Sequence, residues 1–328
     1  MNNTSIINNH DENDDNDWAI PSDVKYNPPN FFLNYESELL LWDFFLKQSL
    51  NLSKEEKKLL DQIALHGIPK EHRKQAYLLL TNSLNTLEEI PKVNNMTQDE
   101  IDASKTQIHN DIERTYKLMN WMKNEENRKR AEKVLNLLVM SNENISYTQG
   151  MNYFSPLIVS IMDNTEAFWT LYHLFQDKIH DQAFIMNRSM EGLMFHNKMH
   201  EIFLKACNPF VFNKFESMSI DPIIYTPQWI LSAGLGPAMP SSLIYLILDR
   251  YIYFGQRSTH SLLLAVIQTQ QQIILNAKVS KEIYEALNKI GYLFYQIDLD
   301  EFVSIWNDLM ISKDDYNAVL NVVSKKDI

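Results

Sequence analysis

The sequence predicts an all-α fold of two helical lobes behind a disordered acidic N-terminal tail. Only 7 glycines and 11 prolines occur among 328 residues, which leaves few positions that would interrupt a helix. Apolar residues recur at helical spacing, as at Val134, Leu135, Leu138 and Val139. No segment alternates polar and apolar residues for long enough to require a strand. Together, these three observations favour long helices over a β fold.

The beginning of the chain differs in composition from the rest. Residues 8–17 are rich in Asn and Asp, and Pro21, Pro28 and Pro29 follow. Such a segment cannot bury enough apolar surface to fold, so we expect a disordered tail, with a docking arm as the alternative. Large apolar side chains come next and predict a helical extension that packs on the main domain. In chain order we expect the tail at 1–30, the extension at 31–66, a main domain at 67–310 with lobes at about 67–185 and 186–310, and a C-terminal helix or tail at 311–328.

Helix boundaries are marked by capping sequences and by breaks in the apolar pattern. Two capping-box sequences, Ser53-Lys54-Glu55-Glu56 and Thr97-Gln98-Asp99-Glu100, predict helix starts. Gly67-Ile68-Pro69 predicts a helix stop, and residues 85–95 predict a loop. The predicted helices span 31–52, 54–66, 71–82, 101–120, 128–140, 151–162, 165–180, 190–206, 240–253, 259–275, 281–295 and 298–310.

Composition and charge exclude several function classes. The net charge is −12 and no long Lys/Arg run occurs, so a nucleic-acid ligand is not expected. No glycine motif for phosphate or dinucleotide binding is present, so the chain should bind no nucleotide by itself. Residues 1–17 lack the apolar core of a signal peptide, and no apolar run approaches the roughly 18 residues of a transmembrane helix. Cys207 is the single cysteine, so no intrachain disulfide can form and we expect a soluble, cytoplasmic protein.

Two short motifs carry most of the functional information. In the first, Asp111 and Arg114 are three residues apart on a predicted helix, so the carboxylate can hold the guanidinium in place. On its own, such a pair is more often a solvated ion pair worth about 0.5 kcal/mol or less. In the second, Tyr147-Thr148-Gln149-Gly150-Met151-Asn152, the glycine relaxes the backbone and could present Gln149 at a surface corner. The alternative is a plain helix N-terminus with an exposed, idle glutamine.

In this order, the two motifs resemble those of the TBC-domain family of Rab GTPase-activating proteins, which read Ile-x-x-Asp-x-x-Arg and Tyr-x-Gln. Both are intact here, beginning at Ile108 and Tyr147. A third family signature, Arg-x-x-x-Trp after Gly-Ile-Pro, is recognisable as Arg73 with Tyr77 in place of the tryptophan. The resemblance covers about residues 67–310, with further matches at Ala167-Phe168-Trp169, Trp229, Pro240 and Asp249.

The resemblance implies a protein that accelerates GTP hydrolysis in trans on a GTP-bound Rab-family small GTPase, as part of vesicle trafficking, and that has no hydrolase activity of its own. Arg114 would stabilise the charge of the transition state, and Gln149 would position the attacking water. The chain would need no cofactor or metal, because the GTPase carries GTP and Mg²⁺, and it would reach endomembranes through the Rab. The supporting residues would be Asp111, which orients Arg114, together with Tyr147, Arg73 and Asn152.

The segment Trp229–Gly236 departs from the family pattern. Two glycines, Gly234 and Gly236, stand where the family usually continues with large apolar residues. Because glycine adds backbone freedom, we expect this segment to be loose and to affect the docking of the GTPase rather than the catalytic pair.

Other hypotheses also fit the sequence. A non-catalytic helical adaptor or effector could bind a small GTPase through the same groove. A metal site could form from His196 and His200, with Glu201 and His180 near them, although histidine pairs on long helices are usually surface groups. Cys207 lies among apolar residues and is expected to be buried and inert.

Overall fold

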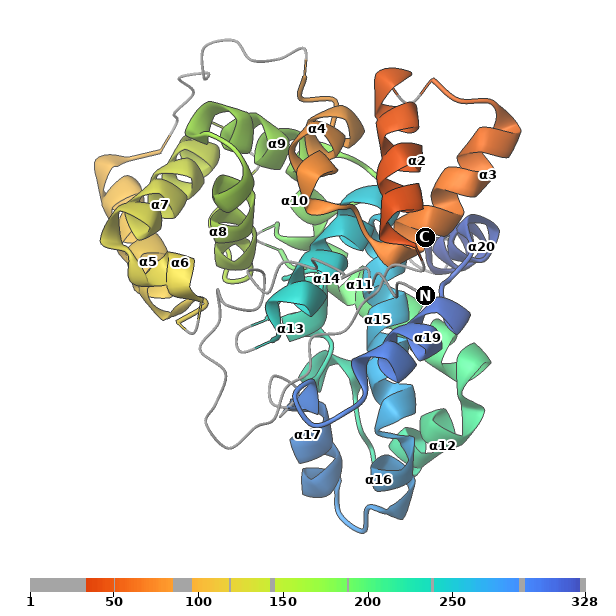
Figure 1. Cartoon of the computed structure of the whole chain (residues 1–328). Helices are drawn as coiled ribbons and strands as arrows, with labels where there is room; N and C mark the ends of the chain where they lie inside the picture. Colours follow the sequence, from red (N-terminus) through yellow and green to blue (C-terminus); the bar gives the residue numbers. More distant parts are fainter. Residues whose placement is uncertain are drawn as a thin grey trace, which may run out of the picture.

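All regular elements in the described part of the chain are helices, as the computed structural model of the protein shows (Figure 1). No residue of that part belongs to a strand, so the all-α prediction is confirmed. None of its helices is both long and apolar enough to cross a bilayer. The tail predicted at 1–30 and the loop predicted at 85–95 lie outside the described residues. The structure describes residues 34–49, 51–84, 96–117, 119–141, 145–187, 189–236, 239–288 and 293–324.

The N-terminal extension is a pair of helices, α2 (Tyr35–Lys47) and α3 (Lys54–Ile63), that continues into the 3₁₀ turn η1 (Ala64–His66). The capping box predicted at the start of α3 is present, because Ser53 and Glu56 exchange backbone-to-side-chain hydrogen bonds. Gly67 then ends the segment at φ +96°, where an added Cβ would lie 3.0 Å from Leu246 Cδ1. The predicted stop at Gly67 is therefore confirmed, and the chain turns there directly against α14 (Ser241–Phe254).

A first group of helices packs around α7, which contacts α5, α6, α8 and α9. One face of α7, including Val134, Leu135 and Leu138, is buried, as the helical spacing of these residues predicts. This group lies together on one side of the molecule (Figure 1). Its helices are α5 (Gln98–Arg114), α6 (Asn120–Lys123), α7 (Glu125–Met140), α8 (Met151–Ile161) and α9 (Asn164–Gln176), while α4 (Lys70–Leu80) contacts α9, α2 and α14.

A second group is built on α14 and α15, which are buried over most of their length. A short helix, α10, contacts both α9 and α11 and so connects the two groups. Two groups fit the two predicted lobes, while the boundaries at 185 and 310 stay predictions. The elements are α10 (Gln182–Ile185), α11 (Glu191–Cys207), α12 (Pro209–Ser217), η2 (Pro222–Ile224), α13 (Pro227–Ile230), α14 (Ser241–Phe254), α15 (Gln256–Thr269), α16 (Gln271–Asn276), α17 (Ser280–Asn288), α19 (Leu299–Asp308) and α20 (Lys313–Ser324).

Arg250 on α14 joins the extension to the C-terminal helices. Its guanidinium is fully buried, donates to the carbonyl oxygen of Leu65 over 2.8 Å and to Asn307 Oδ1 over 2.5 Å, and lies 3.9 Å above the ring of Trp306. Burial lowers the pKa of Arg250 to about 9. The extension therefore packs as an integral part of the domain, as the sequence predicts.

Several local predictions are wrong. The helix expected over 101–120 ends at Arg114, and the helix expected over 259–275 is interrupted at Gln270 between α15 and α16. Cys207 is exposed rather than buried, because it is the last residue of α11 and the buried face of that helix ends at Leu204. The first of these differences decides how the functional site is built.

Candidate functional site

Arg114 is the last residue of α5, and the chain turns sharply just after it. Thr115 is already extended (ψ 133°), and the hydroxyl of its side chain donates to the carbonyl oxygen of Asp111 over 2.6 Å. Tyr116 has a φ of +46° and a fully buried ring, and its hydroxyl donates to the carbonyl oxygen of Tyr153 over 3.1 Å. Burial of the Tyr116 ring against α8 therefore ends α5 at Arg114. The Arg114 side chain lies at the exposed end of that helix.

Asp111 holds the Arg114 guanidinium and is itself buried. Arg114 Nη2 lies 2.6 Å from Asp111 Oδ1, and the Tyr147 hydroxyl donates to Asp111 Oδ2 over 2.7 Å. Burial, and then the hydrogen bond to Asp111, raise the pKa of Tyr147, so its hydroxyl stays protonated as a donor. We name Arg114, Asp111 and Tyr147 the finger triad. It joins the first predicted motif to the second, 33 residues later in the chain.

Gln149 lies in a turn directly before α8, at a corner that only glycine can complete. Gly150 has φ +123° and serves as the N-cap of α8. The side chain of Asn152 fixes this corner from within: its Oδ1 accepts from the Gly150 amide over 2.9 Å, and its Nδ2 donates to the Thr115 hydroxyl over 2.7 Å. The corner predicted at Gln149 is confirmed, and Asn152 ties it to the residue that follows Arg114.

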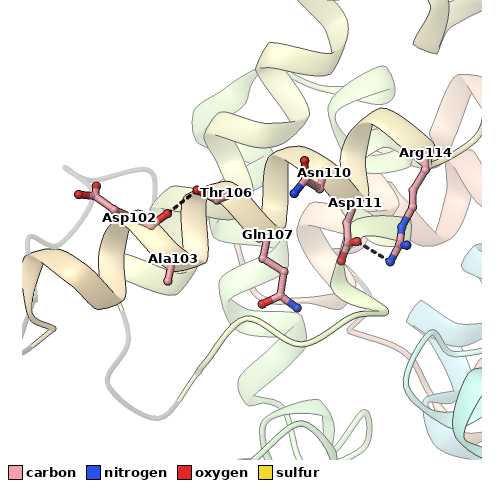
Figure 2. Close-up of a pocket in the computed structure, with 7 residues that line it drawn as sticks. All are labelled: Asp102, Ala103, Thr106, Gln107, Asn110, Asp111 and Arg114. Carbon is pink, nitrogen blue, oxygen red and sulfur yellow. Dashed lines mark hydrogen bonds and ion pairs between the residues drawn. The ribbon is translucent and has the colours of Figure 1, made fainter.

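The two candidate side chains are exposed although their supports are buried. The Arg114 side chain is 57% exposed, whereas that of Asp111 is 5% exposed. Gln149 is exposed and, within the part of the chain that the structure describes, its side chain makes no hydrogen bond. An open hollow of about 650 Å³ runs along α5 up to Arg114 and is lined mainly by polar residues (Figure 2). A second molecule can therefore approach Arg114 from outside.

Comparison with known proteins assigns the family. The model of the Rab-GTPase-TBC domain matches residues 70–275, which is more than half of the chain and includes both motifs. The chain belongs to the TBC-domain family. Two solved structures that resemble it are the TBC domain of a Chlamydomonas flagellar RabGAP (TM-score 0.64, 17% identity, 86% of this chain and 96% of that one) and the Ypt/Rab-GAP domain of Gyp1p (TM-score 0.63, 16% identity, 84% and 99%). These likenesses concern the fold.

Curated relatives are distant and much longer. TBC1 domain family member 2B from Xenopus tropicalis is 23% identical over 265 residues, which cover 76% of this chain and 27% of that protein. Small G protein signaling modulator 3 from Homo sapiens is 23% identical over 271 residues (79% and 34%), and Rab GTPase-activating protein tbc-11 from Caenorhabditis elegans is 21% identical over 247 residues (73% and 26%). The chain thus spans about a quarter to a third of the length of these relatives.

Arg73, predicted as a supporting residue, lies in a separate buried cluster of this TBC domain. Its Nε lies 3.3 Å from both carboxylate oxygens of Asp249, and the Tyr77 hydroxyl donates to Asp249 Oδ1 over 2.5 Å. The Ile68 amide donates to Asp249 Oδ2 over 2.9 Å. We name Arg73, Asp249 and Tyr77 the buried triad. It fastens the start of α4 to α14.

The histidines considered for a metal site are buried, not at the surface. His196, His200 and His260 are each fully buried, with the rings of His196 and His200 stacked on that of His260 at centroid distances of 5.4 and 5.9 Å. Burial lowers the pKa of His200 to about 3, so this ring is neutral. Within the described ranges, no three His, Cys, Asp or Glu side chains are grouped so as to hold a metal ion. Nothing in the spacing of these histidines indicates that His260 completes this stack.

Within the segment Trp229–Gly236, Gly234 makes close contacts that the sequence does not predict. Gly234 has φ +82°, its amide donates to the carbonyl oxygen of Trp229 over 2.7 Å, and an added Cβ would lie 2.3 Å from Leu262 Cδ2. This glycine therefore closes a tight helix end packed against α15, while the looser segment expected from the two glycines stays a prediction.

Proposed function

We propose that this TBC domain accelerates GTP hydrolysis by a Rab-family small GTPase in trans, with Arg114 and Gln149 as its two catalytic groups. One observation carries the proposal: two side chains of the required chemistry are exposed at one place, on supports that are buried and hydrogen-bonded to each other. The names of the Caenorhabditis elegans relative and of the two solved structures point to the same activity.

Arg114 suits the charge that develops during phosphoryl transfer. Negative charge spreads over the phosphoryl oxygens in a loose transition state, and a guanidinium offers several fixed donors to them. An arginine supplied in trans raises the hydrolysis rate by about 10³- to 10⁵-fold, which corresponds to about 4–7 kcal/mol of barrier. Because Asp111 already orients Arg114, less side-chain freedom is lost when the GTPase arrives.

Gln149 suits the attacking water. A glutamine amide can accept a hydrogen bond from that water and donate another to a phosphoryl oxygen. Gln149 has no competing hydrogen bond among the described residues, and its backbone is fixed by Gly150 and Asn152. In this proposal Gln149 takes over the water-positioning role inside the complex.

The partner in this proposal is the GTP-bound state of the GTPase, which brings its own nucleotide and Mg²⁺. The TBC domain itself would need no cofactor. It would work from the cytoplasm and meet vesicle membranes through the GTPase, in the regulation of trafficking.

Single-turnover GTP hydrolysis across a panel of Rab GTPases tests the proposal. The wild-type chain should raise the rate on at least one member by orders of magnitude, and Arg114→Ala and Gln149→Ala should each remove most of that rise without lowering the melting temperature. Lys129→Ala is the control for loss of an exposed, ion-paired cation, and Gln62→Ala is the control for loss of an exposed amide. Full activity in both Arg114→Ala and Gln149→Ala would contradict the assignment.

A non-catalytic adaptor is the alternative, and the same panel separates it from a GTPase activator. An adaptor would bind a GTP-loaded GTPase tightly without changing its hydrolysis rate. The orientation of Arg114 by Asp111 favours the activator, because binding alone does not require a fixed guanidinium beside a fixed glutamine corner.

A further inference from the structure

The glutamine corner touches the main chain of the second helix group. A Cβ atom on Gly150 would lie 2.7 Å from the carbonyl oxygen of Leu231, 3.0 Å from its carbonyl carbon and 3.2 Å from its Cβ. No side chain fits into such a gap, so the two backbones meet directly because residue 150 is glycine. The corner that carries Gln149 is therefore bounded by Asn152 on one side and by Leu231 on another.

The turn that carries Leu231 is itself fixed at both ends. At its start, the Thr226 hydroxyl donates to the carbonyl oxygen of Pro222 over 2.9 Å and to Asn197 Oδ1 on α11. At its end, Gly234 closes the helix and rests on Leu262 of α15. Since α11 and α15 are long helices that pack into the core, residues 226–234 hold the Leu231 carbonyl in a defined place. We name residues 226–234 the α13 turn.

Arg114 has different supports. Its ion-pair partner Asp111 is on α5, and the groups that fix the end of α5 are on α8 and on the segment before it, namely Asn152 and Tyr147. All of these belong to the first helix group. The position of the Arg114 side chain is therefore determined within the first helix group. The turn that carries Gln149 instead lies between that group and the α13 turn of the second group.

We propose that the α13 turn is a positioning element for Gln149, and that Leu231 is its positioning residue. This inference rests on the proposed function. The outer side of the corner is open to solvent, so contact with Leu231 is what keeps the Gln149 backbone from relaxing toward the second helix group. Packing between the two groups thereby sets where Gln149 lies relative to Arg114.

Two variants test the contact from its two sides. Gly150→Ala places a methyl group against the Leu231 carbonyl and should lower the hydrolysis rate at saturating TBC domain by about 100-fold, since a displacement of about 1 Å is enough for such a loss. Leu231→Ala trims a partly buried side chain that anchors the turn and should lower this rate by about 10-fold. In both, the half-saturating concentration should stay within about two-fold of wild type, because neither substitution touches Arg114 or the Asp111 carboxylate that holds it.

Leu309→Ala is the matched control. Leu309 is also a partly buried leucine packed on the core, at the end of α19, which lies well away from α5 and α8 (Figure 1). It should lose a similar amount of thermal stability and keep the wild-type hydrolysis rate. Hydrogen exchange, measured without any GTPase, should quicken at residues 148–151 in Leu231→Ala and stay unchanged there in Leu309→Ala.

A double-mutant cycle separates positioning from mere packing. Adding Leu231→Ala to Gln149→Ala should cost no further rate, because the group that Leu231 positions is already gone. The inference is overturned if Leu231→Ala keeps the wild-type rate, if it costs the same factor without Gln149, or if it changes only the half-saturating concentration. A wild-type chain that accelerates no GTPase would instead contradict the proposed function together with the inference that depends on it.

Discussion

The same three side-chain types, an arginine, an aspartate and a tyrosine, form a hydrogen-bonded set at two places in this TBC domain. In the finger triad and in the buried triad alike, the aspartate receives the guanidinium and the tyrosine hydroxyl. The difference lies in the arginine, whose side chain is 57% exposed at Arg114 and 10% exposed at Arg73. One set leaves its cation available to a partner, and the other uses it internally.

Sequence separation explains that difference. Arg114 and Asp111 are three residues apart on one helix, so their pairing requires no tertiary contact and can be placed at a helix end. Arg73 and Asp249 are 176 residues apart and pair only when α4 and α14 are packed together. The Asp111–Arg114 pair can therefore serve function without stabilising the fold, whereas the Arg73–Asp249 pair helps to hold α4 and α14 together.

Asp249→Ala should have the largest effect, and it should fall on stability. Removing the carboxylate leaves the Arg73 guanidinium, the Tyr77 hydroxyl and the Ile68 amide buried without their acceptor. Breaking a buried ion pair in this way costs about 3–5 kcal/mol. Urea unfolding should show this loss, whereas the hydrolysis rate per folded molecule should stay near wild type. A loss below about 1 kcal/mol would contradict a structural role for the buried triad.

Arg114→Lys should have the next largest effect, and it should fall on catalysis. The substitution keeps the charge and the pairing with Asp111 but loses the planar fork that fits phosphoryl oxygens. We expect the rate at saturation to fall by about 10²- to 10³-fold, or about 2.7–4 kcal/mol of barrier, with the melting temperature unchanged. The matched Arg73→Lys variant should reverse the pattern, with lower stability and the rate retained. Wild-type hydrolysis by Arg114→Lys would show that the guanidinium geometry is not used.

The comparison also shows what the sequence can and cannot predict. The Asp111–Arg114 pair of the finger triad is predictable because both residues share a helix face, and the corner at Gln149 is predictable because a glycine follows it. The contact between Tyr147 and Asp111 was not visible, since it depends on how α8 returns to α5. The end of α5 at Arg114 was missed for the same reason: burial of the Tyr116 ring at positive φ overrides a helical pattern that continues to residue 120.

Long-range packing set the other limits. The sequence placed Arg73 and Asp249 separately on family patterns and could not pair them, and nothing in the spacing of His196 and His200 indicated that His260 would bury both. Gly234 was predicted to add freedom, whereas Leu262 and the Trp229 carbonyl fix it in place. In each case the contact is made by a residue from a distant helix, and local sequence propensity does not predict which residue that is.

Asp111→Asn should have a smaller effect than Arg114→Lys and sharpens the role of the aspartate. The amide keeps an acceptor for Tyr147 but no longer attracts the Arg114 guanidinium. We expect a rate loss of about 10-fold at saturation, because an unrestrained arginine must be ordered when the GTPase binds. Asp102→Asn is the control: Asp102 is exposed and lines the same hollow on α5 (Figure 2), so its removal should leave the rate unchanged. Equal losses in both variants would mean that the charge of the hollow matters rather than the restraint on Arg114.

Tyr147→Phe should have the smallest effect and compares the two triads at a single hydroxyl. Asp111 keeps Arg114 as a donor, so the lost hydrogen bond should cost about 0.5–1.5 kcal/mol of unfolding free energy and only a few-fold in rate. Tyr77→Phe removes the equivalent donor from Asp249, whose pKa burial already raises, and should cost more stability, about 1.5–3 kcal/mol, with no change in rate. Chemical unfolding gives the free energy of unfolding of each variant, and single-turnover assays give the hydrolysis rate of each. If Tyr77→Phe lowers the rate more than Tyr147→Phe does, the division between a finger triad that serves catalysis and a buried triad that serves the fold is wrong.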